Sequence, residues 1–216
     1  MFVRLSTVIY FTAFAVSSAP AADTEQRLYD VSVDGKPAGD FRLTVRTADD
    51  GTETATAVAA VNIRFILGGY RYAYRGTEVW AGGRLRQFDA ASDDNGKKHT
   101  VRAVAAGNEL RVTVDGTGRP VRGDVWPTSY WRLPAAKAGQ SIALLDADTG
   151  EEQTARIEAI GPQILTIGGK SVDCTRVVIS GPASGSLWYD RRGRLVAQET
   201  TEDGHKTGLT LRGIQR

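Results

Sequence analysis

Two aspartates and a histidine around a predicted turn have the types and spacing for acid–base chemistry. Asp93 and Asp94 precede Asn95 and Gly96, and His99 follows shortly after. Asn-Gly is a strong hairpin signal, because a type I′ turn needs positive φ at both central residues. A carboxylate facing an imidazole across such a hairpin is typical of a general base or of a weak cation site. The alternative is a solvated turn, where polar residues are common.

Three tyrosines alternate along one predicted strand and share a side of it: Tyr70, Tyr72 and Tyr74. Trp80 is in phase with them if no bulge intervenes at Gly76. A buried tyrosine, unlike a phenylalanine, needs a partner for its hydroxyl. Two interpretations remain open: a face of the core, since aromatic residues favour strands, or the wall of an amphipathic ligand cavity.

The segment from Trp126 to Trp131 is the one place where the period-two alternation clearly breaks. It contains Trp126, Tyr130 and Trp131, and Pro127 suits the first turn of a helix, so we predict one short helix near 127–133. Such a segment either plugs the open end of a barrel or covers an apolar ligand site.

Our candidate ligand-binding set combines the two aromatic groups: Tyr70, Tyr72, Tyr74, Trp126, Tyr130 and Trp131.

Metal and nucleophilic chemistry has few candidates in this chain. Only two histidines and one cysteine occur, whereas a zinc site usually needs several such ligands. His205 follows a turn glycine, which favours a solvated ring, and Cys174 lies in a predicted strand, which favours a buried, inert thiol. We therefore assign no catalytic residue, and we expect no metal and no cofactor.

The N-terminus has the pattern of an export signal. Arg4 supplies a positive charge, residues 5–16 are mostly apolar, and residues 17–22 are small, with an Ala-x-Ala-like cleavage site. The apolar run is short for a membrane anchor, which is the alternative. We predict a signal peptide over 1–22, a single β-rich domain over 23–216, and a periplasmic or secreted location. A lone cysteine cannot form an internal disulfide, which fits a bacterial periplasm or cell exterior better than a eukaryotic secretory route.

The charge and hydropathy of the chain limit the classes of partner that we expect it to bind. The formal net charge is only +2 and no blocks of like charge occur, so nucleic acid and anionic membrane surfaces are not favoured. No later stretch is long enough for a transmembrane helix. A lipid or another hydrophobic small molecule is the expected partner, and the oligomeric state stays open.

Most of the chain alternates apolar and polar residues between glycine-rich turns, as in residues 29–33, 41–45 and 110–114. This period is typical of strands with one wet face. We count about twelve short strands and no βαβ pattern, which predicts an all-β antiparallel fold, either a strongly curved sheet or a barrel.

Four stretches carry a family resemblance: residues 29–37, 93–96, 187–196 and, most specifically, Asp-Val-Trp-Pro-Thr-Ser-Tyr-Trp over 124–131. Through these four stretches, the chain resembles a family of uncharacterised exported bacterial proteins that is classed as a domain of unknown function. More distantly, it is similar to the periplasmic half-barrels that carry lipoproteins between membranes. The resemblance implies an antiparallel fold and no established activity, and it supplies no catalytic residues.

Three hypotheses follow. The leading one is a periplasmic carrier that binds a hydrophobic or amphipathic ligand in a curved-sheet cavity. The second is a cell-envelope structural or assembly component without a small ligand. The third is a hydrolase-like enzyme that uses Asp93, Asp94 and His99.

Overall fold

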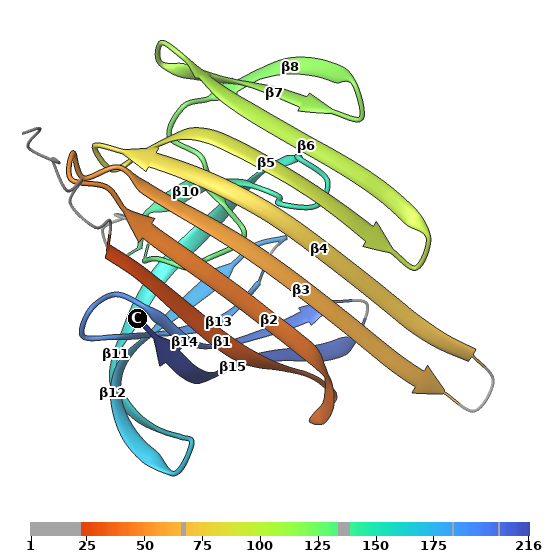
Figure 1. The fold of residues 1–216 in the computed structure, drawn as a ribbon, viewed down its shortest axis with the longest axis vertical. Coiled ribbons are helices and arrows are strands. Elements are labelled where there is room, and N and C mark those ends of the chain that lie inside the picture. The colour runs from red at the N-terminus through yellow and green to blue at the C-terminus, as the bar shows by residue number, and fades with distance from the viewer. Residues whose placement is uncertain (1–22, 66–67, 134–138, 183, 203) are drawn as a thin grey trace, which may run out of the picture.

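The computed structural model describes residues 23–65, 68–133, 139–182, 184–202 and 204–216, and it is built of β-strands (Figure 1). No helix occurs in these ranges. The predicted signal peptide, residues 1–22, lies outside the described residues.

The described residues form fifteen strands in two halves of the chain. The N-terminal half contains β1 (Asp23–Val33), β2 (Lys36–Thr47), β3 (Glu53–Phe65), β4 (Gly68–Ala81), β5 (Arg84–Asp94), β6 (Lys97–Ala106), β7 (Glu109–Val114) and β8 (Thr117–Arg122). The C-terminal half contains β9 (Trp126–Pro127), β10 (Ser141–Leu145), β11 (Glu152–Ile167), β12 (Lys170–Ser180), β13 (Gly185–Asp190), β14 (Leu195–Glu202) and β15 (His205–Gln215).

All fifteen strands belong to one open sheet. Each half is a meander, and the two halves join where β1 pairs with β15, so that β8 and β9 form the two edges. Every ladder is antiparallel except the short parallel pairing of β9 with β10. The all-β antiparallel prediction is therefore confirmed, with an open sheet and fifteen strands instead of about twelve.

The predicted helix near 127–133 is wrong. Trp126 and Pro127 form β9, and the Thr128 amide donates to the Leu145 carbonyl of β10 at 3.0 Å. Tyr130 has a φ of 48°, which is outside the helical region, and Arg132 makes an isolated β-bridge to Arg194. Backbone groups that a helix would have paired within itself are bonded to strands instead.

The core lies between the two halves of the sheet. One large cluster of buried side chains draws on both halves, for example Phe88 and Val112 with Trp188 and Val196. A second cluster belongs to the C-terminal half. The sheet must therefore curve strongly enough to bring β5 and β7 over β13 and β14, because apolar faces are stable only when covered.

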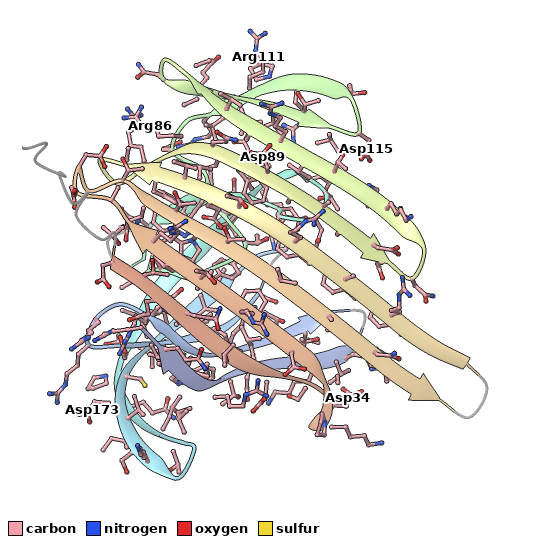
Figure 2. All side chains as sticks on the ribbon, in the orientation of Figure 1. Asp34, Arg86, Asp89, Arg111, Asp115 and Asp173 are labelled. Carbon is pink, nitrogen blue, oxygen red and sulfur yellow. The ribbon has the colours of Figure 1, made fainter. Side chains whose placement is uncertain are left out.

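The outer face of the sheet is charged. On β7, Leu110 and Val112 are buried while Arg111 between them is exposed, as the period of two requires. Figure 2 shows Arg86, Arg111, Asp34 and Asp173 extending from the periphery of the molecule.

Candidate functional site

The segment that broke the alternation lies against β4. We call residues 126–132 the aromatic strap. Trp131 belongs to the large cluster shared by both halves, whereas its neighbour Tyr130 belongs to the cluster of the C-terminal half. Likewise, Leu145 of β10 belongs to the large cluster and Leu144 belongs to the cluster of the C-terminal half. The strap and β10 thus form a partition between the two apolar clusters.

A buried carboxylate attaches the strap to the sheet. Glu78 of β4 is 4% exposed and accepts hydrogen bonds from Trp80 Nε1 at 2.7 Å, Trp131 Nε1 at 2.9 Å and Ser129 Oγ. Burial raises the pKa of Glu78, against the opposing effect of these three donors and of the Arg132 charge. Glu78 therefore holds two tryptophans in fixed orientations.

The inward side of β4 explains how these groups meet. Tyr74, Gly76, Glu78 and Trp80 are all buried, and Arg75 between them is exposed. The β3–β4 ladder has no bulge, so Trp80 is in phase with the tyrosines, as predicted. A Cβ on Gly76 would lie 2.2 Å from the Tyr74 hydroxyl oxygen, so only glycine leaves room for that ring.

Arg132 lies among three indoles. Its guanidinium carbon is 5.2 Å from the ring centroid of Trp80, 5.9 Å from that of Trp126 and 5.3 Å from that of Trp131. The same guanidinium is paired with Glu53. Cation–π contact of this kind favours a partly desolvated cation, so the strap carries its own positive charge into the aromatic cluster.

Tyr72 reaches a second carboxylate in the loop after β10. Its hydroxyl donates to Asp148 at 2.7 Å, and burial raises the pKa of Asp148. Asp146 accepts from the Asp148 and Thr149 amides, which folds the loop back toward the sheet. Arg119 of β8 donates to the Gly150 carbonyl at 2.6 Å, so the loop also contacts the sheet edge.

Tyr130 has an unusual backbone for a bulky buried residue. Its φ of 48° lies in the left-handed region, which non-glycine residues seldom adopt. Its carbonyl accepts from the Tyr189 hydroxyl at 2.9 Å, and Arg27 donates to the next carbonyl, that of Trp131, at 3.1 Å. Strain at such a position persists only where the surroundings determine it, so we regard the strap as a functional candidate.

A pocket of about 290 Å³ opens beside the strap. Trp80 and Trp126 form its aromatic wall, with ring centroids 4.6 Å apart. Its further apolar lining comes from Leu85, Val125, Ile142 and Ala143, and its charged lining from Arg84, Arg122 and Asp124.

The six predicted ligand-binding aromatics divide by position. Trp126 lines the pocket, while Tyr74, Tyr130 and Trp131 are buried. Tyr72 packs beside the large cluster, and Tyr70 lies farther along β4, against a small cluster of Val31, Ala38 and Val61. Three of the six thus belong to the strap, Tyr74 shares the large cluster with Trp131, and Tyr72 packs against both that cluster and the small one beside Tyr70.

The predicted hairpin site has a different geometry from the one expected. Asp93 accepts from the Gly96 amide at 2.8 Å, which is a turn contact, and Asp94 is exposed. His99 Nδ1 lies 2.9 Å from Asp115, a residue of the β7–β8 turn. The three predicted residues therefore share a hairpin, but the carboxylate that meets the imidazole is a fourth one, which the spacing did not indicate.

Within the described ranges, no group of three or more histidine, cysteine or acidic side chains could hold a metal ion. Cys174 is a buried free cysteine, as predicted, and burial raises the pKa of its thiol. Among the described residues, no helix is long and apolar enough to cross a membrane.

The sequence interpretation missed Glu78, Arg132 and Asp148. Glu78 stands at an inward position of β4, two residues before Trp80, so the period of two could have identified it. A carboxylate on a core-facing position needs partners. Arg132 and Asp148 had no comparable signal, because Glu53 and Trp80, which contact Arg132, and Tyr72, which contacts Asp148, lie on strands distant in the chain.

The family model described as Domain of unknown function (DUF6134) matches residues 29–212. The chain belongs to this family. The resemblance to an uncharacterised family is therefore confirmed. No curated protein shows a significant match to this DUF6134 chain.

Solved structures resemble this DUF6134 chain at low sequence identity. A β-barrel-like protein of unknown function, DUF1849, from Brucella abortus aligns with a TM-score of 0.68 and 10% identity, over 89% of this chain and 97% of that one. A DUF1089 protein from Pseudomonas aeruginosa has a TM-score of 0.45 and 12% identity, over 88% and 95%. A provisionally named lipoprotein from Parabacteroides distasonis has a TM-score of 0.36 and 10% identity, over 89% of this chain and 95% of that one. The first likeness supports a barrel-like all-β fold.

Proposed function

We propose that this protein is an exported binding module that takes up a small amphipathic molecule in the pocket beside Trp126. One observation carries the proposal: two indoles, of Trp80 and Trp126, form the wall of an open pocket that also contains arginines. Aromatic walls with a few polar groups are typical of small-molecule sites. The volume of about 290 Å³ suits a small ligand.

The charges of the pocket favour an anionic group on that ligand. Arg122 is paired with Asp124 through two contacts of 2.7 Å, which neutralises both. Arg84 adds a second guanidinium to the same lining. The pocket thus has a positive charge in excess, and we expect a ligand with a flat apolar body and a carboxylate, sulfate or phosphate.

The strap supports the wall instead of acting as a lid over a large cavity. Trp131 and Tyr130 fill the space between the halves, so the binding surface left to a ligand is the face of Trp126. Glu78 orients Trp80, and Arg132 packs against both indoles. In this proposal the aromatic residues of the strap hold the pocket in shape, and Trp126 alone among them touches the ligand.

Native mass spectrometry of protein purified from its own host tests the proposal. We expect a bound small molecule that is released on denaturation and that quenches tryptophan fluorescence when it is added back. Arg84→Gln should weaken that binding about tenfold, as expected for one charge-assisted hydrogen bond. Arg86→Gln, an exposed charge change outside the pocket, is the matched control. A clean apo mass, or equal loss in both variants, would contradict the proposal.

A further inference from the structure

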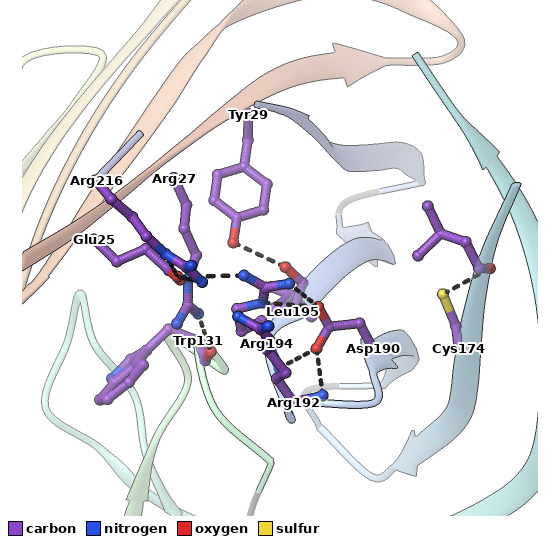
Figure 3. Close-up of polar contacts among 11 residues, drawn as sticks. Glu25, Arg27, Tyr29, Trp131, Cys174, Asp190, Arg192, Arg194, Leu195 and Arg216 are labelled. Carbon is purple, nitrogen blue, oxygen red and sulfur yellow. Dashed lines mark hydrogen bonds and ion pairs between the residues drawn. The ribbon is translucent and has the colours of Figure 1, made fainter. Parts of the chain in front are cut away.

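A second hollow lies where the start of β1, the end of β15 and the β13–β14 turn meet (Figure 3). Its volume is about 470 Å³, and four side chains line it: Arg192, Arg194, Ile214 and Arg216. Three of the four are arginines, in a chain whose net charge is only +2.

The turn between β13 and β14 places two of these arginines. Asp190 accepts from the Arg192 amide at 2.9 Å and from the Arg194 amide at 3.0 Å. The Gly193 amide donates to the Asp190 carbonyl, and Gly193 has a φ of 72°. This closed turn orders the backbone, so the Arg192 and Arg194 side chains start from determined positions.

One carboxylate is shared by three guanidinium groups. Arg27 Nε contacts one oxygen of Glu25 at 2.8 Å, while Arg194 and Arg216 approach the other oxygen at 3.2 Å (Figure 3). Burial acts to raise the pKa of Glu25, but these arginines outweigh it and lower the pKa, so Glu25 is ionised at neutral pH.

The charges of this cluster do not balance. Among the side chains, Glu25 and Asp190 supply two negative charges, against the positive charges of four arginines, counting Arg27 beside the hollow. The guanidinium of Arg192 makes no hydrogen bond or ion pair with the residues that the structure describes. Within the described residues, the Arg216 guanidinium is held only by the long contacts to Glu25, and 54% of its side chain is exposed. The guanidinium N–H donors of Arg192 and Arg216 are therefore available on the open side of the hollow.

We propose that this hollow binds a phosphate-class oxyanion. A guanidinium presents parallel N–H groups that match two oxygens of such an anion, and several guanidinium groups around one hollow favour a group with more than one negative charge. Ile214 provides apolar surface beside the charge, which accommodates a carbon substituent on the phosphate. The hollow is lined by none of the residues of the Trp126 pocket, so this inference is independent of the function proposed above.

Titration with inorganic phosphate, followed by NMR or calorimetry at low salt, tests the inference. We expect saturable binding that weakens as salt rises. Arg192→Gln should reduce the affinity at least about fivefold, because it removes a charged donor. Arg191→Gln is the matched control: it removes the same charge one residue away, from a side chain that pairs with Asp173 outside the hollow. Both side chains are exposed, so both variants should fold.

Two results would overturn the inference: the absence of saturable phosphate binding, or an equal loss in the Arg191 and Arg192 variants, which would indicate diffuse charge attraction. Flotation with phosphatidylcholine vesicles, with and without phosphatidylglycerol, then distinguishes the source of the phosphate. Binding that needs phosphatidylglycerol and Arg192 assigns the site to a lipid headgroup. Phosphate binding without vesicle binding assigns it to a free oxyanion.

Discussion

At the scale of single residues, a few enclosed or shared charged groups fix the positions of their neighbours. The small net charge of the chain does not reveal these groups. Glu78 is enclosed by two indole N–H groups and a serine hydroxyl. Arg132 lies among three indoles, and Glu25 is shared by three arginines. Buried charges are expensive unless they are paired, so each of these groups constrains its neighbours more strongly than an apolar side chain would.

Glu78→Gln should change how stability depends on pH. Because the pKa of Glu78 is raised in the folded state, the folded protein binds this proton more tightly than the unfolded chain, and stability falls as pH rises from about 4.5 to the folded pKa. Glutamine can accept from both indoles through its carbonyl and donate to Ser129, so it resembles the protonated acid. The free energy of unfolding of the variant, relative to the native chain, should rise with pH over that window.

Urea unfolding at a series of pH values measures this difference. The raised pKa of Asp148 acts in the same direction, but it is present in both proteins and cancels in the comparison. Glu109→Gln, an exposed acid on β7, serves as the control and should leave the profile unchanged. A variant profile parallel to that of the native chain would show that the ionisation of Glu78 does not affect stability.

At the scale of elements, the close approach of β2 to β3 constrains the sheet, and the anchored strap positions the candidate site. Gly39 of β2 faces β3, where an added Cβ would lie 2.0 Å from the Ala60 carbonyl oxygen. The strap is anchored by its aromatic side chains in two clusters and by backbone bonds to β10. Neither feature follows from the intrinsic secondary-structure propensity of its residues, because both depend on which groups of the neighbouring strands lie opposite them.

Gly39→Ala should destabilise the protein by about 1–3 kcal/mol, because the backbone of β3 must shift to admit the methyl group. Gly213→Ala on β15 is the matched comparison, since an added Cβ there meets nothing within 4 Å. That change should be neutral or stabilise by up to about 1 kcal/mol, as glycine weakens a strand interior. Thermal unfolding of both variants measures the contrast, and equal melting temperatures would contradict it.

Trp131→Ala should cost about 3–5 kcal/mol, because it removes a large side chain from the shared cluster and the indole donor of Glu78. The near-ultraviolet circular dichroism of the remaining tryptophans should weaken as well. Leu133→Ala, just beyond the strap and 40% exposed, should change stability by less than about 1 kcal/mol. Similar losses in the two variants would mean that the strap is not anchored through Trp131.

At the scale of the whole molecule, the two meanders share one core. β1 and β15 join them by pairing, and the large cluster contains side chains from β5 and β7 together with others from β13 and β14. The large cluster needs both halves, because it combines Trp131 of the strap and Leu145 of β10 with side chains of β5 and β7. The halves should therefore unfold together.

Urea unfolding followed by far-ultraviolet circular dichroism and by tryptophan fluorescence should give one coincident transition. The four tryptophans report on both halves, since Trp80 lies on β4 and Trp188 on β13. The same experiment tests the prediction of a single domain over 23–216. Two separated transitions, with Trp80→Phe removing the fluorescence signal of the N-terminal half only, would assign the halves to independent domains.

The sequence by itself determined the strand class, the turns, the inward side of β4, the burial of Cys174 and the family. These properties depend on local periodicity and on glycine positions, which are visible in consecutive residues. The tertiary structure alone decided that His99 meets Asp115, that Glu78 binds Trp131, and that Arg192, Arg194 and Arg216 surround one hollow. The contact between His99 and Asp115 depends on the register of β6 with β7. The contact of Glu78 with Trp131, and the approach of Arg216 to Arg194, join segments that are far apart in the chain and depend on how the strands are arranged in space.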